Sequence, residues 1–314
     1  MIVVFGSINV DLTARVDRFP QPGETIHGRS FAVVAGGKGA NQALAARRAG
    51  ASVVMVGAIG NDAFASAAVS GLSDAGVDIG AVRRIDGQTG VAVIAVDARG
   101  QNSIVVVPGA NDTVAAADLP ESALGPNTTL VMQLEVPLSA VAEVAARARV
   151  RGTRVVLNAA PAMALPATLL SAVDVLVVNE HEAEALATAS AVASAPEAFA
   201  VAMWERFGCA TVVTLGARGA LAAVEGGQLL SAGAPAVDVV DTTGAGDALV
   251  GALAAALDRG ASWPHALAEG VAAGSLACTR AGAQAALPTA DAIGELAARI
   301  GTTFGSSASG QRGG

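Results

Sequence analysis

The sequence predicts an α/β fold: a three-layer sandwich in which helices cover both faces of a mainly parallel central β-sheet, with a small β-sheet lid attached. Two observations predict it. Short runs rich in Val, Ile and Leu, which suit strands buried on both faces, alternate with Ala-rich stretches of helical period. Two other segments are rich in β-branched residues and leave little room for helices, so we expect them to form the lid.

The expected elements follow one another along the chain. Strands of the central sheet are expected over residues 2–5, 53–56, 130–134, 154–157, 175–178 and 211–215. Helices are expected between them, over residues 39–49, 63–75, 138–151, 180–187 and 197–207. The lid strands fall within residues 11–34 and 89–107, where the segments 20–23 and 97–100 carry turn signals. We therefore predict one α/β domain over residues 1–300 and a disordered Gly- and Ser-rich tail over residues 301–314.

The composition excludes several classes of protein. Of 314 residues, 53% are hydrophobic, but no apolar run reaches the length of about 20 residues that a membrane span needs. The net charge of −8 and the aromatic content of 3% argue against a nucleic-acid surface. Two cysteines without Cys-x-x-Cys spacing indicate neither a disulfide framework nor a zinc site, which fits a reducing cytoplasm. The first residues lack the pattern of a signal peptide, so we expect no export.

The segment 239–251 contains the strongest functional motif, Asp-Thr-Thr-Gly-Ala-Gly-Asp at residues 241–247. A strand-like start, a Gly-rich turn and an apolar helix follow one another in it. Gly244 and Gly246 allow the backbone to approach an anion, at which the free N–H groups of the helix start point. Asp247 lies in the first helical turn, where its carboxylate can remove a proton from a hydroxyl group that attacks phosphorus. A base and an anion hole in one loop indicate phosphoryl transfer.

Purely structural roles would explain parts of this motif. An Asp in the first turn of a helix often only interacts with the helix dipole, and a pair of glycines after a strand is often a tight turn. The Walker motif is absent, and Gly-x-Gly-x-x-Gly is not formed because the third glycine falls at Gly251. Helix capping accounts for only one of the two acidic residues, Asp241 and Asp247, so a functional role is the favoured interpretation.

A second Gly-rich segment, Ala-Gly-Gly-Lys-Gly-Ala-Asn-Gln at residues 35–42, opens a helix directly after the expected lid strands. Three glycines in four positions allow a polyhydroxylated ligand to lie against the backbone, and Asn41 offers both a donor and an acceptor. This combination suits a sugar. A flexible turn with an exposed Lys38 is the structural alternative.

With these two motifs the sequence resembles the ribokinase family, the phosphofructokinase-B type carbohydrate kinases. The resemblance runs from Gly-Ser-Ile-Asn-Val-Asp at residues 6–11 to about Pro288, which is nearly the whole chain apart from the tail. Within the family it is most similar to the kinases of ribose, whose pattern also occurs at residues 22–25, 36–43, 133–137 and 279–284. The resemblance implies an ATP-dependent sugar kinase that phosphorylates D-ribose at the 5-hydroxyl group to give ribose 5-phosphate, a step of D-ribose catabolism.

The resemblance also implies roles for individual residues. Asp247 is implied to be the general base, with an anion hole formed by Gly244, Ala245 and Gly246. The implied sugar ligands are Asn9, Asp11, Gly37, Lys38, Asn41, Glu135 and Asp247. The implied ATP ligands are Asn179, Thr214, Gly216, Arg218, Gly219, Gly246 and Val271. Mg²⁺ is implied to accompany ATP, with Glu182 acting through water, in line with the preference of Mg²⁺ for oxygen ligands and retained waters.

Potassium is implied as a monovalent activator next to the anion hole. Its implied ligands are Asp241, Thr243 and the backbone carbonyl groups near Ala277, Arg280, Gly282 and Ala286. Ala286 stands where relatives often have Ser, which matters little because a carbonyl ligand does not depend on the side chain.

Departures from the family pattern leave the substrate open. Residues 248–250 are Ala-Leu-Val where relatives often have an aromatic residue and Asn, and Val271 replaces a polar residue at the adenine edge. Fructose, deoxyribose or a nucleoside is therefore the alternative substrate. A non-catalytic sensor of sugar or nucleotide is the alternative from another class, and the intact Asp247 argues against it. A small sheet with open edges or an apolar face also predicts a homodimer that forms through the lid.

Overall fold

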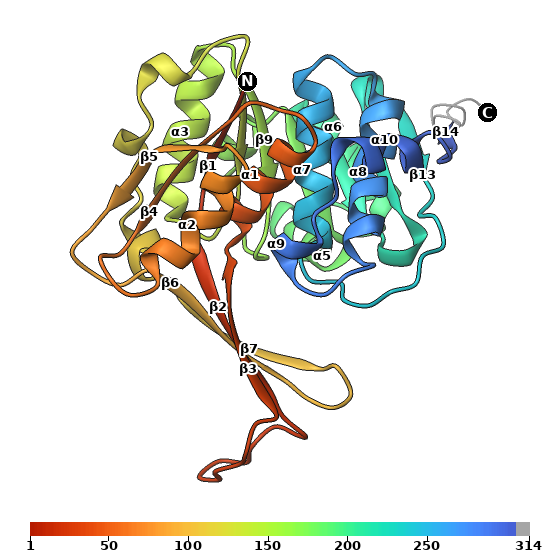
Figure 1. Cartoon of the computed structure of the whole chain (residues 1–314). Helices are drawn as coiled ribbons and strands as arrows, with labels where there is room; N and C mark the ends of the chain where they lie inside the picture. The colour runs from red at the N-terminus through yellow and green to blue at the C-terminus, as the bar shows by residue number, and fades with distance from the viewer. Residues whose placement is uncertain (306–314) are drawn as a thin grey trace.

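The computed structural model describes residues 1–305, which form two β-sheets with helices on both sides of the larger one (Figure 1). The central sheet has ten strands within these residues. Their order is β14 (Thr302–Phe304), β13 (Leu229–Ala232), β12 (Ala220–Ala223), β11 (Ala210–Thr214), β10 (Val175–Asn179), β9 (Arg154–Asn158), β8 (Thr129–Met132), β1 (Ile2–Phe5), β4 (Val53–Ile59) and β5 (Asp78–Arg84). The strands from β11 to β5 are parallel, whereas β12, β13 and β14 are antiparallel. The predicted fold with a mainly parallel central sheet is confirmed.

Each predicted run of the central sheet lies in or overlaps a strand, namely β1, β4, β8, β9, β10 or β11, and the runs 130–134 and 211–215 extend past the ends of β8 and β11. The strands at the two edges of the sheet were not predicted. β5 is largely half-exposed, so it lacks the continuous apolar run of a buried strand. β12 reads Ala-Leu-Ala-Ala, a composition that favours a helix, and only its pairing with β11 and β13 makes it a strand.

The alternation of side chains along β1 explains the three layers. Ile2 and Val4 belong to one hydrophobic core and Val3 and Phe5 to the other, because successive residues of a strand point to opposite faces. The first core includes residues of α1 (Lys38–Arg48), α2 (Ala65–Asp74), α7 (Ala245–Asp258), α8 (Trp263–Ala277) and α10 (Ala290–Ala297). The second includes residues of α3 (Leu138–Val150), α4 (Ala167–Leu170), α5 (Glu180–Ser190) and α6 (Pro196–Phe207). The predicted helices correspond to α1, α2, α3, α5 and α6.

The segments predicted to form the lid build a separate sheet that extends from the body as an arm (Figure 1). Its four strands lie in the order β3 (Ser30–Gly36), β2 (Asn9–Arg15), β6 (Gly90–Val96) and β7 (Asn102–Val107). β2 and β6 are parallel, and the other two pairs are antiparallel. The predicted turn joins β6 to β7, where the N–H group of Gly100 donates to the carbonyl oxygen of Asp97 at 3.0 Å.

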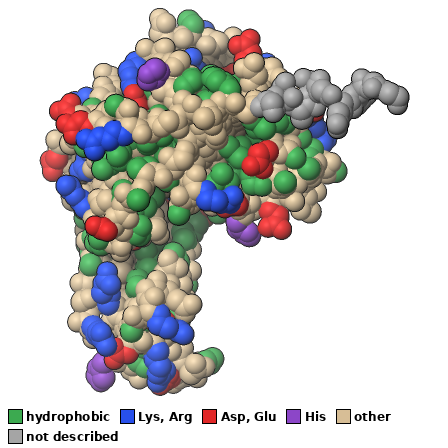
Figure 2. Space-filling model, turned by 90° about the vertical axis from the view of Figure 1, so that its right-hand side faces the viewer, with side chains coloured by type: hydrophobic (Ala, Val, Ile, Leu, Met, Phe, Trp, Pro, Cys, Tyr) green, Lys and Arg blue, Asp and Glu red, His purple; other side chains and the backbone are tan. Residues whose placement is uncertain are grey.

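The loop between β2 and β3 forms the far end of the arm. Figure 2 shows charged and histidine side chains gathered there. Ion pairs join Arg18 to Glu24 and Arg29 to Asp17. The end of the arm is therefore polar, whereas its sheet carries exposed Val, Ile and Phe side chains.

The structure differs from the predicted tail at its first residues. Thr302–Phe304 form β14, and the N–H group of Gly305 donates to the carbonyl oxygen of Leu229 at 2.8 Å. An edge strand such as β13 offers unpaired backbone groups to a segment that passes beside it, and local composition does not reveal this. The rest of the predicted tail, residues 306–314, lies outside the described residues. No helix within residues 1–305 is long and apolar enough to cross a membrane.

Candidate active site

The order of the strands places a crevice at the carboxyl ends of β1 and β8. β1 lies between β4 and β8, so the chain winds outward to both sides from this point. Ligands of open α/β sheets bind at such a switch point. Polar residues follow or end the strands there, namely Ser7 and Asn9 after β1, Gln133 and Glu135 after β8, Asn158 in β9, Asn179 in β10 and Thr214 in β11.

Asp247 lies in the first turn of α7 and is buried, with 8% of its surface exposed. Asn41 Nδ2 donates to its Oδ2 at 2.9 Å, and Gln42 Nε2 donates to its Oδ1 at 2.9 Å. Burial raises the pKa of Asp247 above its usual value, although the Lys38 ammonium and the two amides oppose this. A carboxyl group with a raised pKa is a stronger proton acceptor once it is ionised, which suits a general base.

The start of α7 has the geometry of an anion hole. Gly244 has a φ of 78°, and an added Cβ would lie 2.9 Å from Ala283 Cα, so only glycine fits without strain. An added Cβ on Gly246 would meet nothing within 4 Å, so space is open above the helix start. Ala245 differs from its neighbours, because its N–H group donates to the carbonyl oxygen of Thr242 at 3.2 Å. The N–H groups of Gly244 and Gly246 donate to no backbone carbonyl oxygen within residues 1–305, so they can donate to an anion.

Asn9 and Asp11 share one face of β2, at the end of the arm that joins the body. The Asp11 carboxylate lies over Gly36, where an added Cβ would be 2.4 Å from Oδ1. Burial, together with the charges of Glu135 and Asp247, raises the pKa of Asp11 to about 6. These three carboxyl groups, which lie far apart in the sequence, are therefore close enough for their charges to interact.

Glu135 is oriented by groups from two other elements. Its Oε2 accepts from Ser7 Oγ at 2.6 Å and from the N–H group of Lys38 at 3.0 Å. The second bond lies at the N-terminus of α1, where the helix dipole favours a negative charge. Gly37 has a φ of 89°, and an added Cβ there would lie 2.7 Å from the backbone nitrogen of Asn9. The Gly-rich motif at residues 35–42 thus packs closely against the residues that follow β1.

The Lys38 ammonium interacts with carboxylates predicted to contact the sugar and with one predicted to lie beside ATP. Its burial lowers its pKa, but the carboxylates of Asp247, Glu135 and Glu182 outweigh this and raise the pKa above its usual value. A cavity of about 280 Å³ brings together Lys38, Asn158, Asn179, Glu182, Thr214, Gly244, Gly246 and Asp247. Asn41 Oδ1 is buried and has no hydrogen-bond partner in the described residues, so it can accept from a ligand.

Asn179 and Glu182 form a capping box at the start of α5. Asn179 Oδ1 accepts from the N–H group of Glu182 at 2.8 Å, and Glu182 Oε2 accepts from the N–H group of Asn179 at 2.8 Å. Burial raises the pKa of Glu182, although Asn179 and Lys38 oppose this. These two hydrogen bonds satisfy backbone N–H groups at the start of the helix, which is a structural role for both side chains. Asn179 and Glu182 also line the cavity, and their roles beside ATP stay predictions.

The other residues assigned to ATP lie in different surroundings. Thr214 lines the cavity, whereas Arg218 is exposed and paired with Glu180. Gly219 has a structural reason to be glycine, because an added Cβ would lie 2.1 Å from the carbonyl oxygen of Ala232. Val271 is buried in the core that includes α7 and α8, so the structure does not bring its side chain to the cavity. Its contact with adenine stays a prediction, as does that of Gly216 and Arg218 with ATP.

The residues assigned to potassium come together from two segments. Asp241 Oδ1 accepts from the N–H group and the hydroxyl group of Thr243 at 2.9 and 2.6 Å, and its Oδ2 accepts from the N–H group of Gly282 at 2.9 Å. Burial raises the pKa of Asp241, but these hydrogen bonds outweigh it and hold the pKa below its usual value. Ala277 ends α8, Arg280 follows it, and Ala286 ends α9 (Ala283–Ala286). The hydrogen bonds bring Asp241, Thr243 and Gly282 together, and the binding of potassium by these residues and by the carbonyl groups of Ala277, Arg280 and Ala286 stays a prediction.

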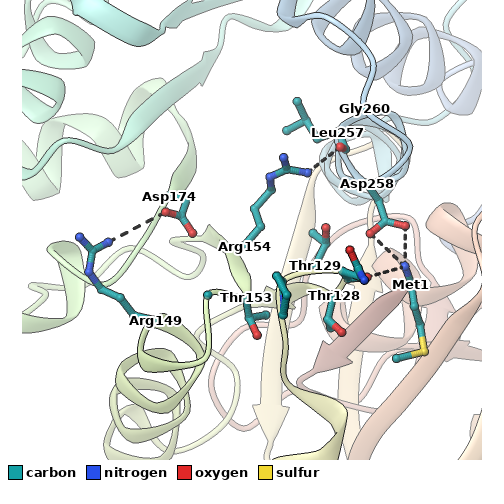
Figure 3. Close-up of a pocket in the computed structure, with 13 residues that line it drawn as sticks. Met1, Thr128, Thr129, Arg149, Thr153, Arg154, Asp174, Leu257, Asp258 and Gly260 are labelled. Carbon is teal, nitrogen blue, oxygen red and sulfur yellow. Dashed lines mark hydrogen bonds and ion pairs between the residues drawn. The ribbon is translucent and has the colours of Figure 1, made fainter.

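A larger cavity, of about 820 Å³, lies at the opposite edge of the sheet, where the strands begin (Figure 3). Its positive groups already have partners. The amino group of Met1 is 2.9 Å from Asp258, and Arg154 Nη1 donates to the carbonyl oxygen of Leu257 at 2.5 Å. Because ligands of such sheets bind at the carboxyl ends of the strands, we do not place the active site here.

Several residues of the site have no role predicted from the sequence. Ser7, Gln42, Asn111, Gln133 and Asn158 hydrogen-bond to predicted site residues or to one another. Asn111 Nδ2 donates to Asn9 Oδ1 at 2.7 Å and so orients it. Single Asn, Gln and Ser residues at strand ends are common, and their only sequence signal is that Ser7, Gln42 and Gln133 lie within segments that follow the family pattern.

A buried carboxylate beside a helix start that can bind an anion, with sugar-compatible groups around it, defines a small-molecule kinase. The family model of the pfkB family carbohydrate kinases matches residues 1–290, and the chain belongs to this family. The resemblance that the motifs indicated is thereby confirmed.

The most similar proteins include ribokinases. The chain is 37% identical to the ribokinase of Haemophilus influenzae over 292 residues, which cover 92% of this chain and 95% of that protein. The ribokinase structure from Thermotoga maritima has a TM-score of 0.87 at 32% identity and covers 94% of this chain and 98% of that one. The Arabidopsis thaliana ribokinase structure, which contains ribose and ATP, has a TM-score of 0.85 at 31% identity, with the same two coverages.

Proposed function

We propose that this protein catalyses the ATP-dependent phosphorylation of D-ribose at the 5-hydroxyl group. The observation that carries the proposal is the position of Asp247: a buried carboxylate in the first turn of α7, directly after the open helix start at Gly246. Similarity to ribokinases over nearly the whole chain supports ribose as the sugar. The product, ribose 5-phosphate, fits a role in D-ribose catabolism.

The proposed reaction is a single phosphoryl transfer. Asp247 accepts the proton of the 5-hydroxyl group, and the ribose oxygen forms a bond to the γ-phosphorus of ATP. The bond between that phosphorus and the bridging oxygen of ADP breaks, so ADP leaves with the electron pair. The N–H groups of Gly244 and Gly246 stabilise the charge on the transferring group. Closure of the lid would exclude water, which otherwise competes with ribose for the phosphoryl group.

Ribose is proposed to be held by hydrogen bonds rather than by stacking. The chain has an aromatic content of only 3% and no Tyr, so few rings are available. Asp11 and Glu135 are charged acceptors, which make stronger hydrogen bonds than neutral ones, while Asn9 and Asn41 provide amides. The unpartnered Oδ1 of Asn41 supports this assignment, because a buried acceptor without a donor is costly in the free protein.

Mg²⁺ and potassium are proposed cofactors that fit the groups present. Within residues 1–305, no cluster of three or more His, Cys, Asp or Glu side chains could hold a metal ion. A Mg²⁺ ion that is bound mainly by ATP phosphates and waters needs only one carboxylate, for which Glu182 is the candidate. Mg²⁺ would neutralise charge on the phosphates. Potassium would be held by Asp241, Thr243 and nearby carbonyl groups, where it adds positive charge behind the anion hole.

A panel of sugars assayed for ADP release, with and without potassium, tests the function. We expect ribose to give the highest kcat/KM, and potassium to raise the rate above that with sodium alone, because the Asp241 charge would otherwise oppose the phosphates. Fructose, deoxyribose and a nucleoside are the other substrates to be assayed, since residues 248–250 depart from the family pattern. A higher kcat/KM for one of them would replace ribose as the substrate. If no sugar in the panel causes ATP consumption, a non-catalytic sensor of sugar or nucleotide would be favoured.

We also propose a homodimer that forms through the arm, because one face of the arm's sheet is apolar and exposed. Val33, Leu12, Val93 and Val105 form a row across all four strands, on the face opposite to Asp11. Val105 is 61% exposed, and Phe31 on the same face is 65% exposed. An open apolar face of this kind is unusual on a monomer, and a second copy of the same sheet would cover it.

Light scattering after size-exclusion chromatography tests the dimer. The wild type is expected to have twice the mass of the chain, and Val105→Asp to be monomeric because burial of an unpaired charge opposes association. Val150→Asp is the matched control, since Val150 is 86% exposed at the end of α3, and it should remain dimeric. A monomeric wild type at micromolar concentration would rule out this assembly.

The proposed compartment is the cytoplasm. Cys209 and Cys278 are both free, which fits a reducing environment. The proposed second substrate, ATP, is also an intracellular metabolite.

A further inference from the structure

A chain of buried amide side chains continues from the Asp247 carboxylate into the protein. Gln42 Nε2 donates both to Asp247 Oδ1 and to Asn158 Oδ1, each at 2.9 Å. Gln42 Oε1 accepts from Gln133 Nε2 at 2.6 Å. Gln42 and Gln133 have no exposed surface, so water does not compete for these hydrogen bonds.

Asp247 and Asn158 set the direction of the bonds in this chain, whereas Gln133 Oε1 has no hydrogen-bond partner within residues 1–305. An ionised carboxylate only accepts, so Gln42 must present its NH₂ group to Asp247 and its oxygen to Gln133. Asn158 Nδ2 donates to the carbonyl oxygen of Val177 at 3.1 Å, which leaves Asn158 Oδ1 for Gln42. Gln133 and Asn158 therefore hold the Gln42 amide in place independently of Asp247.

Gln42 and Asn41 together fix how the Asp247 carboxylate is turned. Asn41 donates to Oδ2 and Gln42 to Oδ1, so a rotation of the carboxylate plane would break both hydrogen bonds. A carboxylate has about four acceptor positions, and two of them stay free for a ligand. Their direction is thus set before the sugar binds, which lowers the cost of reaching the geometry for proton transfer.

We propose that Gln42, held by Gln133 and Asn158, is a positioning residue that fixes the orientation of the Asp247 carboxylate for proton transfer from the sugar hydroxyl group. The proposal rests on the proposed role of Asp247 as the general base. It extends the site beyond the groups that touch sugar or ATP, to a buried layer between α1, β8 and β9.

The charges around Asp247 determine what loss of Gln42 would do. Four charged groups influence Asp247 or are influenced by it: Lys38 on α1, Glu135 after β8, Asp11 on β2 and Glu182 on α5. Burial raises the pKa of Asp247, whereas the hydrogen bond from Gln42 lowers it by stabilising the ionised form. Without that bond the pKa rises, so a smaller fraction of Asp247 is ionised at a given acidic pH. The acid limb of the rate profile must then move to higher pH.

Gln42→Met tests the proposal, because Met keeps the length of the side chain but offers no N–H donor. Single-turnover rates with Mg·ATP and ribose, or with whichever sugar the panel selects, are measured across the acid limb of the profile. We expect the maximal rate to fall about tenfold, which is the scale of one hydrogen bond to a charged group. We also expect the acid limb to move up by about half to one pH unit, with KM for the sugar changed by less than about threefold.

Two further variants separate positioning from general damage to the fold. Gln133→Met removes only the bond that holds Gln42, and should move the acid limb in the same direction by a smaller amount. Gln228→Met is the matched control, since Gln228 is exposed in a turn far from the site along the chain, and it should leave the profile unchanged. A purely structural role of Gln42 would lower Tm without moving the limb.

An acid limb that stays at its wild-type position in folded Gln42→Met, or moves to lower pH, overturns the proposal. If circular dichroism shows that Gln42→Met does not fold, Gln133→Met decides by the same criterion. The role of Asp247 is tested separately by Asp247→Asn. An inactive Asp247→Asn together with an unmoved limb in Gln42→Met refutes only the positioning, whereas an active Asp247→Asn refutes the general base.

Discussion

Asp247→Asn is expected to lower kcat at least about 100-fold while ribose still binds, because the amide cannot accept the proton of the 5-hydroxyl group. The change keeps the shape of the side chain and a hydrogen-bonding group in the same place. Its effect should therefore fall on turnover rather than on affinity. ADP release gives kcat, and calorimetric titration with ribose gives the affinity.

Asp291→Asn is the matched control for this variant. Asp291 also lies in the first turn of a helix, α10, but it is exposed and remote in sequence from the site. An Asp that only interacts with a helix dipole contributes roughly 0.3–1 kcal/mol to stability and nothing to turnover. If Asp247→Asn kept turnover within about tenfold of the wild type, as Asp291→Asn should, Asp247 would be a helix-start residue and not the base.

Gly251→Ala is expected to destabilise the fold by about 1–3 kcal/mol and to lower kcat by about 100-fold, although residue 251 does not line the cavity. An added Cβ at Gly251 would lie 2.5 Å from Ala45 Cβ and 2.7 Å from Ala46 N. These atoms belong to α1, so α1 and α7 must separate. The same two helices carry Asn41 and Gln42 on one side and Asp247 on the other, and their hydrogen bonds would lengthen.

The same substitution at Gly294 should have the opposite effect on stability. Gly294 lies on α10, is exposed, and has open space where its Cβ would be. Gly294→Ala should therefore raise stability by roughly 0.5–1 kcal/mol and leave kcat unchanged, because Ala loses less backbone entropy in a helix. Thermal unfolding and ADP release measure both pairs of effects. Equal Tm values for Gly251→Ala and the wild type would mean that the helices can separate without cost.

Much of the fold could be predicted because its signals are local. The buried parallel strands, such as β1 and β10, are continuous apolar runs, and the helices between them keep a helical period over ten or more residues. The two Gly-rich motifs are also local, since a glycine with positive φ at Gly37 or Gly244 belongs to a turn of a few residues. Strands such as β5 and β12 could not be predicted, because neighbours in the sheet and not their own sequences make them strands.

The candidate site also contains residues that local motifs reveal and residues that only tertiary packing connects. The motif residues Asn41 and Asp247 could be singled out from sequence, but their hydrogen bond joins positions 206 residues apart. Gln42, Gln133 and Asn158 are ordinary amides in the sequence, and only the packing of α1 over the ends of β8 and β9 connects them. Val271, assigned from a family pattern, lies buried in a hydrophobic core, so its contact with adenine stays a prediction.

The sequence by itself determined the class of fold, the two glycine-rich helix starts and the acid that belongs to one of them, since each depends on the conformation of a few consecutive residues. The tertiary structure alone decided that Asp247 is buried, that its carboxylate is turned by two amides from α1, and that Gly251 lets α1 and α7 approach closely enough for this. The physical reason is that backbone preference acts over a few residues, whereas the orientation and pKa of a buried carboxylate depend on groups brought to it from distant parts of the chain.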